Sequence, residues 1–184
     1  MNIIIQPYGS DSCYCRPDTT WERENRDFYS PECVEDIYWT PVMFARISKA
    51  GKCIGSRFAA RYYDAVGFGA LLYIGKGDVA FTSCADRTSL LPMPLFNPSV
   101  LEGEYNVYET FRNGQSILKY NSSGKIGIIE DSICKASALT SLRIGDIVAS
   151  EIAPMQILAS RADGNVDFRS VYCENELFGI KLLF

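Results

Sequence analysis

The pattern of hydrophobic and polar residues along the chain predicts mainly β-strands. Residues 39–47 contain an unbroken apolar run from Val42 to Ala45, which indicates a strand buried on both faces. Residues 105–111 and 116–120 flank Asn113-Gly114, a dipeptide typical of a two-residue hairpin turn. Further strands are expected at residues 71–74, 79–82, 155–160, 166–173 and 177–184, and another begins at Ile147.

Two modest helices interrupt these strands. Ser56 can cap the first, over residues 57–66, where Phe58 and Tyr62 fall on one face with Ala65 or Val66. The second covers residues 129–139. Residues 1–35 and 83–103 are expected to be irregular because prolines and turn residues break them up. The whole chain, residues 1–184, is therefore predicted to be one β-dominated α+β domain.

Composition and charge narrow the class of partner. The 184 residues carry 18 Lys and Arg against 22 Asp and Glu, a net charge of −4, which argues against a broad nucleic-acid surface. The N-terminus has a three-residue apolar run without a basic flank, and no run approaches the roughly 18 apolar residues of a membrane span. We therefore expect a cytoplasmic protein with neither a nucleic-acid nor a membrane partner.

The seven cysteines are odd in number and scattered, unlike a secreted disulfide framework. We expect them to be reduced and mostly buried. Cys13 and Cys15 form the one close pair, but no second pair exists to complete a zinc or iron–sulfur site. Packing or a reactive surface thiol explains them better than metal or redox chemistry.

The chain contains no histidine, which limits its chemistry. Ser-His-Asp and Cys-His catalysis, histidine metal sites and an imidazole base are all excluded. Gly67-Phe-Gly69 and Gly75-Lys-Gly77 lack the spacing of a phosphate-binding loop and are interpreted as tight turns. Glu102 and Glu104 fit a carboxylate pair and an exposed turn equally well. The residues by themselves therefore define no active site.

Several short motifs nevertheless occur in the order found in one family. From about residue 15 onward, the chain resembles the fumarylacetoacetate hydrolase family, above all its short single-domain acylpyruvate hydrolases. The resemblance implies a β-roll or mixed sheet with two short helices. It rests on Arg16-Pro-Asp-Thr19, Phe28-Tyr-Ser-Pro31, Phe96-Asn-Pro-Ser99, Gly103-Glu-Tyr105, Asn113-Gly114, Tyr120-Asn-Ser-Ser123 and Leu142-Arg-Ile-Gly-Asp146.

The resemblance also implies a Mg²⁺ or Mn²⁺ site, held in the family by a His-x-Glu-x-Glu strand and the Asp of Gly-x-Asp. At the matching positions this chain has Tyr38 for the histidine, Thr40 and Val42 for the glutamates, and Leu71 for the aspartate. We therefore expect no metal and no cofactor. Residues 1–14 show no counterpart of the family's lid with its general-base pair. The predicted vestigial cleft comprises Arg16, Tyr38, Thr40, Val42, Leu71 and Asn121.

Three functions follow from this pattern. The leading hypothesis is a non-catalytic binding or assembly subunit, as a homodimer or as a heterodimer with an active relative. The alternative is a hydrolase or decarboxylase of a small oxo-acid, whose relocated site uses Glu102, Glu104, Lys76 or a cysteine. The third is a sensor whose pocket, lined by Val42 and Leu71, takes an uncharged or aromatic ligand. Ordinary core packing explains these two residues as well.

Overall fold

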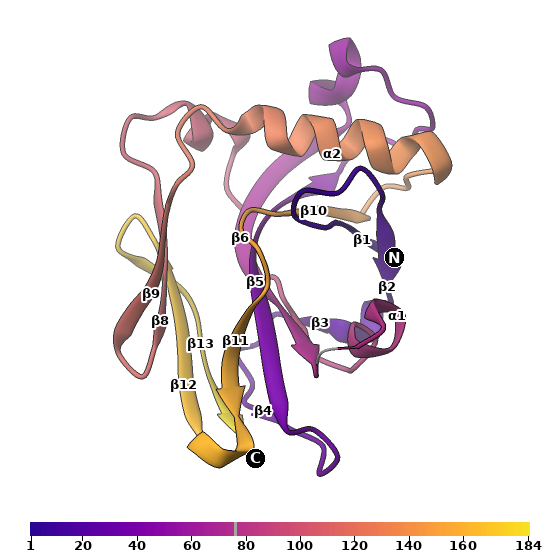
Figure 1. The fold of residues 1–184 in the computed structure, drawn as a ribbon. Helices are drawn as coiled ribbons and strands as arrows, with labels where there is room; N and C mark the ends of the chain where they lie inside the picture. Colours follow the sequence, from indigo (N-terminus) through magenta and orange to yellow (C-terminus); the bar gives the residue numbers. More distant parts are fainter. Residues whose placement is uncertain (76) are drawn as a thin grey trace.

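Two β-sheets pack against each other and one long helix lies across their end, as the computed structural model shows (Figure 1). The structure describes residues 1–75 and 77–184, with Val79 described through its backbone alone. The first sheet contains β1 (Ile3–Gln6), β2 (Tyr14–Arg16), β3 (Trp21–Glu22), β5 (Asp36–Ile47), β6 (Tyr63–Ile74), β7 (Ser89–Leu90), β10 (Ile147–Glu151) and β11 (Gln156–Ser160).

The second sheet is smaller and open. It contains β4 (Phe28–Tyr29), β8 (Val107–Arg112), β9 (Gln115–Asn121), β12 (Val166–Tyr172) and β13 (Asn175–Leu183) in the order β4-β13-β12-β8-β9. The helices are α1 (Val79–Thr82) and α2 (Ile126–Leu139), with 3₁₀ turns η1 (Asp18–Thr20), η2 (Ser56–Arg61), η3 (Pro98–Glu102) and η4 (Arg161–Asp163). The predicted α+β, strand-dominated class is confirmed.

The antiparallel pair β5 and β6 forms the centre of the first sheet, whose order is β2-β1-β10-β5-β6-β7-β3, with β11 also paired to β5. One face of this pair packs on the second sheet, where Trp39 meets Phe168 edge-to-face at 5.2 Å. The other face lies inside the curl of the first sheet. Burial on both faces, predicted for residues 39–47, is confirmed.

The first sheet curls because its edge strand β2 reaches back to strands near the other edge. The guanidinium of Arg16 donates hydrogen bonds to the carbonyls of Leu72 on β6 and Thr88 just before β7, at 3.1–3.2 Å. Trp21, on the opposite edge strand β3, donates from Nε1 to Leu91 O at 2.8 Å, which fastens β3 to the neighbouring strand β7. The Arg16 bonds close the sheet around a buried apolar interior, which is the roll visible in Figure 1.

The hairpin and the second helix confirm two local predictions. β8 and β9 pair through a turn in which Asn113 (φ 50°) and Gly114 (φ 79°) both adopt left-handed conformations, as the twist of a two-residue hairpin requires. α2 begins three residues earlier than predicted and buries Ile129, Ile133 and Ala136.

Four predictions about local structure are wrong. Gly67-Phe-Gly69 is not a tight turn, because both glycines lie inside β6 and pair with β5. The expected helix over 57–66 is a 3₁₀ turn, η2, after which β6 begins at Tyr63 because β5 offers a full-length strand partner. Residues 79–82 form the short helix α1, since Asp78 accepts the Ala80 N–H at 3.0 Å and so starts a helical turn. Residues 1–35 are not merely irregular: all four residues of β1 are buried, between β2 and β10.

The cysteines also differ from expectation. All seven are free, but none is buried: Cys13, Cys134 and Cys173 are partly exposed and the other four are exposed. Most of them lie in loops or near the ends of elements rather than in the apolar interiors of the sheets. In the part of the chain that the structure describes, no helix combines the length and the apolar character needed to cross a membrane.

Candidate functional site

The predicted ligand positions meet on the inner face of the curled sheet. The register of β5 and β6 places Tyr38 opposite Tyr73, Thr40 opposite Leu71, and Val42 opposite Gly69. Directly opposed residues of an antiparallel pair point to the same face, so these side chains form one row inside the roll. The resemblance therefore identified positions that do lie side by side.

The space between these positions is filled. Thr40, Val42 and Leu71 have no exposed surface, and Val42 and Leu71 belong to an apolar cluster that fills the roll. Among the residues that the structure describes, apolar side chains of this cluster fill the space that the sensor hypothesis assigns to an apolar ligand. The other members of the cluster are Ile3, Ile5, Phe44, Tyr73, Leu91, Ile147 and Ala149.

A carboxylate from a third strand enters the same place. Glu151, the last residue of β10, lies opposite Val42 and is only 8% exposed. Its Oε1 accepts hydrogen bonds from the hydroxyl of Thr40, at 3.1 Å, and from the hydroxyl of Tyr73. Its Oε2 accepts the backbone N–H of Tyr8 at 3.0 Å. The protein's own hydroxyl and amide donors thus occupy both carboxylate oxygens.

Two tyrosines connect this carboxylate to a buried arginine. The hydroxyls of Tyr14 and Tyr73 are 2.6 Å apart, and Arg16 Nε donates to Tyr14 at 3.5 Å. The Arg16 guanidinium stacks on the Tyr73 ring at 4.5 Å and is 1% exposed. We call Thr40, Glu151, Tyr73, Tyr14 and Arg16 the buried polar chain; it joins strands β2, β5, β6 and β10.

Burial governs the protonation of the two phenols. It raises the pKa of Tyr73 far above the ordinary tyrosine value of 10.0, and it raises the pKa of Tyr14 as well. Both side chains are therefore neutral hydrogen-bonding groups at physiological pH. They connect strands, and they are unsuited to serve as phenolate bases or nucleophiles.

Replacement of Tyr73 by Phe tests this chain. The variant should lose about 1–3 kcal/mol of unfolding free energy at pH 7, because the buried Glu151 loses a hydroxyl donor. The raised folded pKa means that wild type loses stability as pH rises above 10.0, by up to about 1.4 kcal/mol per pH unit. The difference between wild type and Tyr73→Phe should therefore narrow between pH 9 and 11 in urea denaturation. A difference that stays constant across this range would contradict the assignment.

One predicted cleft residue lies elsewhere. Asn121 is exposed at the end of β9, in the second sheet, and its Oδ1 accepts the Ser123 N–H at 3.0 Å. It therefore caps a local turn and is not brought to the buried polar chain. Arg16, by contrast, stacks on Tyr73, which lies opposite Tyr38 in the row of predicted ligand positions.

The residues considered for a relocated site are dispersed. Glu102 lines a surface cavity of about 380 Å³ together with Tyr63 and Glu130, and the Tyr63 hydroxyl donates to Glu130 at 3.3 Å. Glu104 is exposed in the loop beyond this cavity, and Lys76 lies outside the described residues. Partial desolvation by neighbouring protein atoms raises the pKa of the Cys13 and Cys15 thiols, which favours their unreactive neutral form.

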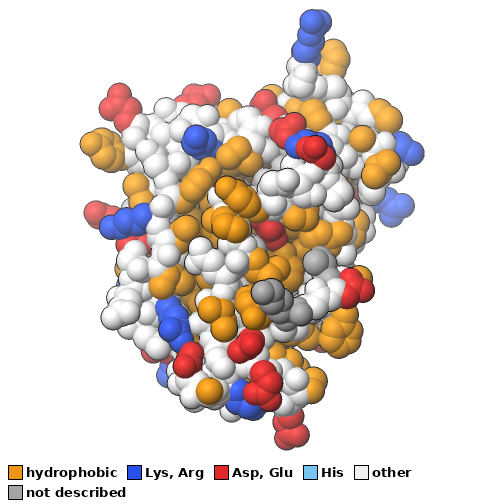
Figure 2. Space-filling model, viewed as in Figure 1, with side chains coloured by type: hydrophobic (Ala, Val, Ile, Leu, Met, Phe, Trp, Pro, Cys, Tyr) orange, Lys and Arg blue, Asp and Glu red, His pale blue; other side chains and the backbone are white. Residues whose placement is uncertain are grey.

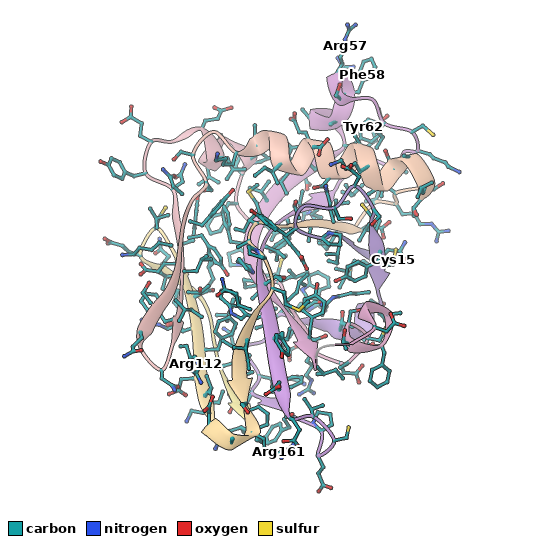
Figure 3. The ribbon with its side chains drawn as sticks, in the orientation of Figure 1. Cys15, Arg57, Phe58, Tyr62, Arg112 and Arg161 are labelled. Carbon is teal, nitrogen blue, oxygen red and sulfur yellow. The ribbon has the colours of Figure 1, made fainter. Side chains whose placement is uncertain are left out.

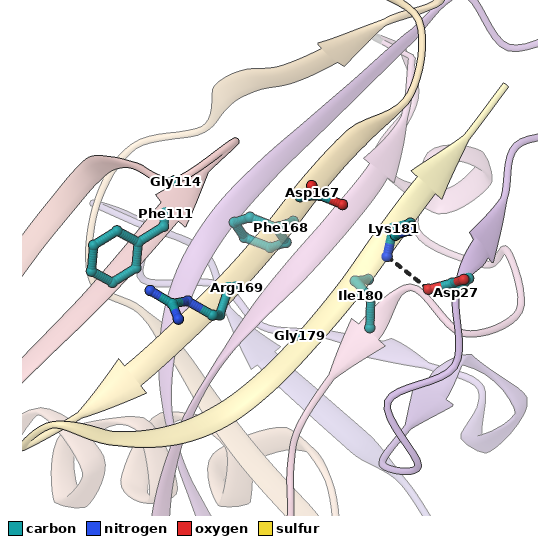
Figure 4. A pocket seen from close by; sticks show the side chains of 9 residues that line it. All are labelled: Asp27, Phe111, Gly114, Asp167, Phe168, Arg169, Gly179, Ile180 and Lys181. Carbon is teal, nitrogen blue, oxygen red and sulfur yellow. Dashed lines mark hydrogen bonds between the residues drawn. The ribbon is translucent and has the colours of Figure 1, made fainter.

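Another cavity, of about 440 Å³, lies on the outer face of the second sheet (Figure 4). Two of its four charged side chains have partners: the Asp27 carboxylate accepts the backbone N–H of Lys181 at 2.8 Å, and Arg169 stacks on Phe111 at 4.8 Å while lying 3.7 Å from Glu176. These two groups are therefore held in structural contacts. The lining residues are Asp27, Phe111, Gly114, Asp167, Phe168, Arg169, Gly179, Ile180 and Lys181.

The residues at the family's ligand positions do not fit Mg²⁺ or Mn²⁺. Within residues 1–75 and 77–184, no group of three or more Cys, Asp or Glu side chains gathers where it could hold a metal ion. These cations require about six oxygen ligands, and Val42 and Leu71 supply none. Thr40 and Glu151 are already bonded to each other. The donor set is therefore that of a hydrogen-bonded core.

Sequence comparison alone finds no relative: no family model matches the chain, and neither does any curated protein. Comparison of three-dimensional structures does find similar proteins. A Yersinia pestis protein assigned to the fumarylacetoacetate hydrolase family superimposes with a TM-score of 0.79, at 12% identity, covering 99% of this chain and 92% of that one. The chain has the fumarylacetoacetate hydrolase fold.

Enzymes of known reaction share this fold. Fumarylpyruvate hydrolase from Pseudomonas aeruginosa, in complex with Mn²⁺ and pyruvate, gives a TM-score of 0.78 at 12% identity and covers 100% of this chain and 90% of that one. Maleylpyruvate hydrolase from Sphingobium sp. SYK-6 gives a TM-score of 0.80 at 14% identity, and the match covers 99% of this chain and 70% of that one. The fumarylacetoacetate hydrolase fold implied by the sequence motifs is thus confirmed, and identities this low establish the fold alone.

Sequence reasoning missed Tyr14, Tyr73 and Glu151. A faint signal existed for Glu151, since it is a charged residue directly after the apolar stretch Ile147-Val-Ala-Ser150. Tyr73 lies within an apolar run, Ala70-Leu-Leu-Tyr-Ile74, as the one residue there with a hydroxyl. Nothing in the sequence pairs these residues, because Tyr73 and Glu151 are 78 positions apart.

Proposed function

We propose that this chain is a fumarylacetoacetate hydrolase-fold protein that does not perform the family's metal-dependent reaction and serves as a binding or assembly subunit. One observation carries the proposal. The places where carboxylates would hold a cation contain buried Val42 and Leu71, and the nearby Glu151 is bonded to Thr40 and Tyr73.

The energetics favour the same conclusion. A divalent cation gives up water only where several protein oxygens replace it. Here the aliphatic side chains would offer none, and binding through Glu151 would have to break its bonds to Thr40, Tyr73 and the Tyr8 amide. Each buried donor left without a partner costs about 1–3 kcal/mol. The fold therefore does not need a metal at this place, because the hydrogen bonds of Glu151 satisfy the buried groups there.

The partner in such an assembly is a second copy of this chain or an active relative. Hydrophobic side chains gather across the middle of the face between the two sheets (Figure 2). Beside the buried polar chain, Tyr8 is 55% exposed, and Ile157, which pairs with Tyr38, is 56% exposed. Exposed apolar residues next to an emptied site support a contact role for this face.

A relocated active site is the second candidate. It is favoured by the cavity that Glu102 shares with Glu130 and Tyr63, since two carboxyl groups and a phenol can bind and polarise a small oxo-acid. Burial raises the pKa of Tyr63, so this phenol would act as a hydrogen-bond donor. The two candidates differ in one measurable property, which is turnover without a cation.

An activity assay separates them. The purified chain is incubated with an acylpyruvate and with oxaloacetate, with and without about 5 mM Mg²⁺ or Mn²⁺, beside the Pseudomonas fumarylpyruvate hydrolase as a positive control. We expect no turnover above the rate without protein, and no shift of the melting temperature with either cation. Cation-dependent turnover would contradict the proposal. Cation-independent turnover that Glu102→Gln abolishes would overturn it in favour of the relocated site.

A further inference from the structure

Basic residues are concentrated in one short segment of this acidic chain. Residues 48–62 contain Lys49, Lys52, Arg57 and Arg61 and no Asp or Glu, although the whole chain has a net charge of −4. All four basic side chains are exposed. The rest of the molecule therefore has a more negative net charge than the whole chain, and positive charge is concentrated in this one segment.

The segment folds against the C-terminal end of α2 and the turn that follows it. The Cys53 N–H donates to Ser137 O at 2.8 Å, and Gly51 and Leu142 exchange backbone hydrogen bonds of 3.1 and 2.8 Å. η2 projects beyond α2, with Arg57 and Phe58 at its tip (Figure 3). We call this region the basic end; it comprises Lys49, Lys52, Arg57, Phe58, Arg61, Leu139, Arg143 and Ile144.

The positive charges of the basic end are not neutralised within the molecule. Among the residues that the structure describes, none of its five basic side chains forms an ion pair. The nearest acid along the chain, Asp64, is held by Arg46 through bonds of 3.0 and 2.8 Å. Asp146 is 1% exposed and accepts backbone N–H groups of Asn2 and Arg143.

The basic end also contains large apolar side chains that are exposed to solvent. Phe58 is 50% exposed, Leu139 83% and Ile144 73%. Arg61 stacks on Phe58 at 5.3 Å, so the ring and the charge are presented together. The three apolar residues come from η2, from the end of α2 and from the turn after it. They are therefore three separate exposed side chains, each contributed by a different segment of the basic end.

We propose that the basic end docks on the surface of an anionic lipid bilayer. Phe58, Leu139 and Ile144 enter the interfacial region, where the loss of exposed apolar surface favours binding. The lysine and arginine side chains lie at headgroup level, where anionic lipids attract them. The acidic remainder of the molecule is repelled by the same surface, so docking has one preferred orientation.

The observations favour a lipid surface over two other anionic partners. Nucleic acid would use the charges, but it would leave Leu139 and Ile144 without a favourable environment. A rigid acidic protein would need a matching pocket for each of these exposed apolar side chains, whereas a fluid lipid interface can accept them without preformed pockets. The expectation of no membrane partner rested on the average charge and on the lack of a spanning segment. Docking on the surface of a membrane requires neither a positive net charge of the whole chain nor a membrane-spanning segment.

Vesicle sedimentation tests the proposal with the full chain. The vesicles contain either phosphatidylcholine alone or phosphatidylcholine with about 30% phosphatidylserine. Wild type should sediment with the anionic vesicles at about 0.1 M salt and dissociate at about 0.5 M, because salt screens the headgroup charge. Arg57→Glu combined with Arg61→Glu should weaken this binding at least about tenfold. Phe58→Ser should weaken it at both salt concentrations.

A matched control carries the same change of charge away from the basic end. Arg23→Glu combined with Lys125→Glu alters two exposed residues, and Lys125 precedes α2 at the end opposite Leu139. This control should bind as wild type does, and melting temperatures should show that all variants are folded. Equal weakening by the control, or no binding of wild type to anionic vesicles, would overturn the proposal. So would displacement from the vesicles by DNA or by polyglutamate at low concentration, which would indicate a nucleic-acid or protein partner.

Discussion

Replacement of Arg16 by Met is expected to lower the free energy of unfolding by about 3–5 kcal/mol, the largest effect of any single side chain in the buried polar chain. The Arg16 guanidinium donates to Leu72 O twice, to the carbonyl and hydroxyl of Thr88, and to the hydroxyl of Ser89. Met fills much of the volume but offers no donor. The carbonyls that close the roll would then be buried without these bonds, and the contact between β2 and the far strands would be lost.

Arg23→Met is the matched control for this prediction. Arg23 is exposed and stacks on Trp21 at 4.8 Å, without a role in closing the sheet. Its replacement should cost less than about 1 kcal/mol. Urea denaturation of both variants measures the difference. Equal losses for Arg16→Met and Arg23→Met would show that Arg16 does not hold the roll closed.

The second large effect is expected for Gly69→Ala, at about 3 kcal/mol or more. A Cβ at position 69 would fall on the carbonyl oxygen of Leu90, a backbone atom in the strand paired with β6. β6 cannot move away freely, because Tyr108 also donates to Gly69 O at 2.8 Å and Val42 lies opposite Gly69 in β5. The substitution should therefore separate β7 from β6 and weaken the roll at its rim.

Gly179→Ala provides the comparison. Gly179 lies inside β13 on an exposed face, and the atom nearest to an added Cβ would be Glu176 Oε1, at an ordinary 3.4 Å. This variant should change stability by less than about 1 kcal/mol, since Ala fits there and reduces the entropy of the unfolded chain. Guanidinium denaturation, analysed with one m-value for both variants, measures the change in unfolding free energy that each substitution causes. A Gly69→Ala variant as stable as Gly179→Ala would contradict the close packing of β7 on β6.

The elements that sequence predicted well are those fixed by local chemistry. The Asn113-Gly114 turn supplies the backbone conformations that its hairpin needs, and the Val42-Met-Phe-Ala45 run is buried whichever way the sheet lies. The expected helix over 57–66 failed because the spacing of Phe58, Tyr62 and Val66 is only a local preference. Pairing of β6 along the full length of β5 overrides it.

The sequence motifs predicted which positions lie together, and they did not predict which side chains surround those positions. The motifs located Thr40, Val42 and Leu71, and the structure places them in one row. What fills the site depends on contacts between distant parts of the chain: Tyr8 and Glu151 are 143 residues apart, and Tyr14 and Tyr73 are 59 apart. Side-chain pairs of this kind follow from the curl of the sheet. A single sequence contains no local pattern that specifies them.

We propose that a hydrogen-bonded chain from Thr40 through Glu151 and Tyr73 to Arg16 occupies the place where the family resemblance implies a cation. Titration of Mn²⁺ with the purified protein, followed by the electron paramagnetic resonance signal of the free ion, tests it most directly. We expect the signal to remain that of free Mn²⁺ at up to about a tenfold excess of protein over metal. Loss of the signal with one saturable site per chain, reversed by added Mg²⁺ and abolished by Glu151→Gln, would contradict it.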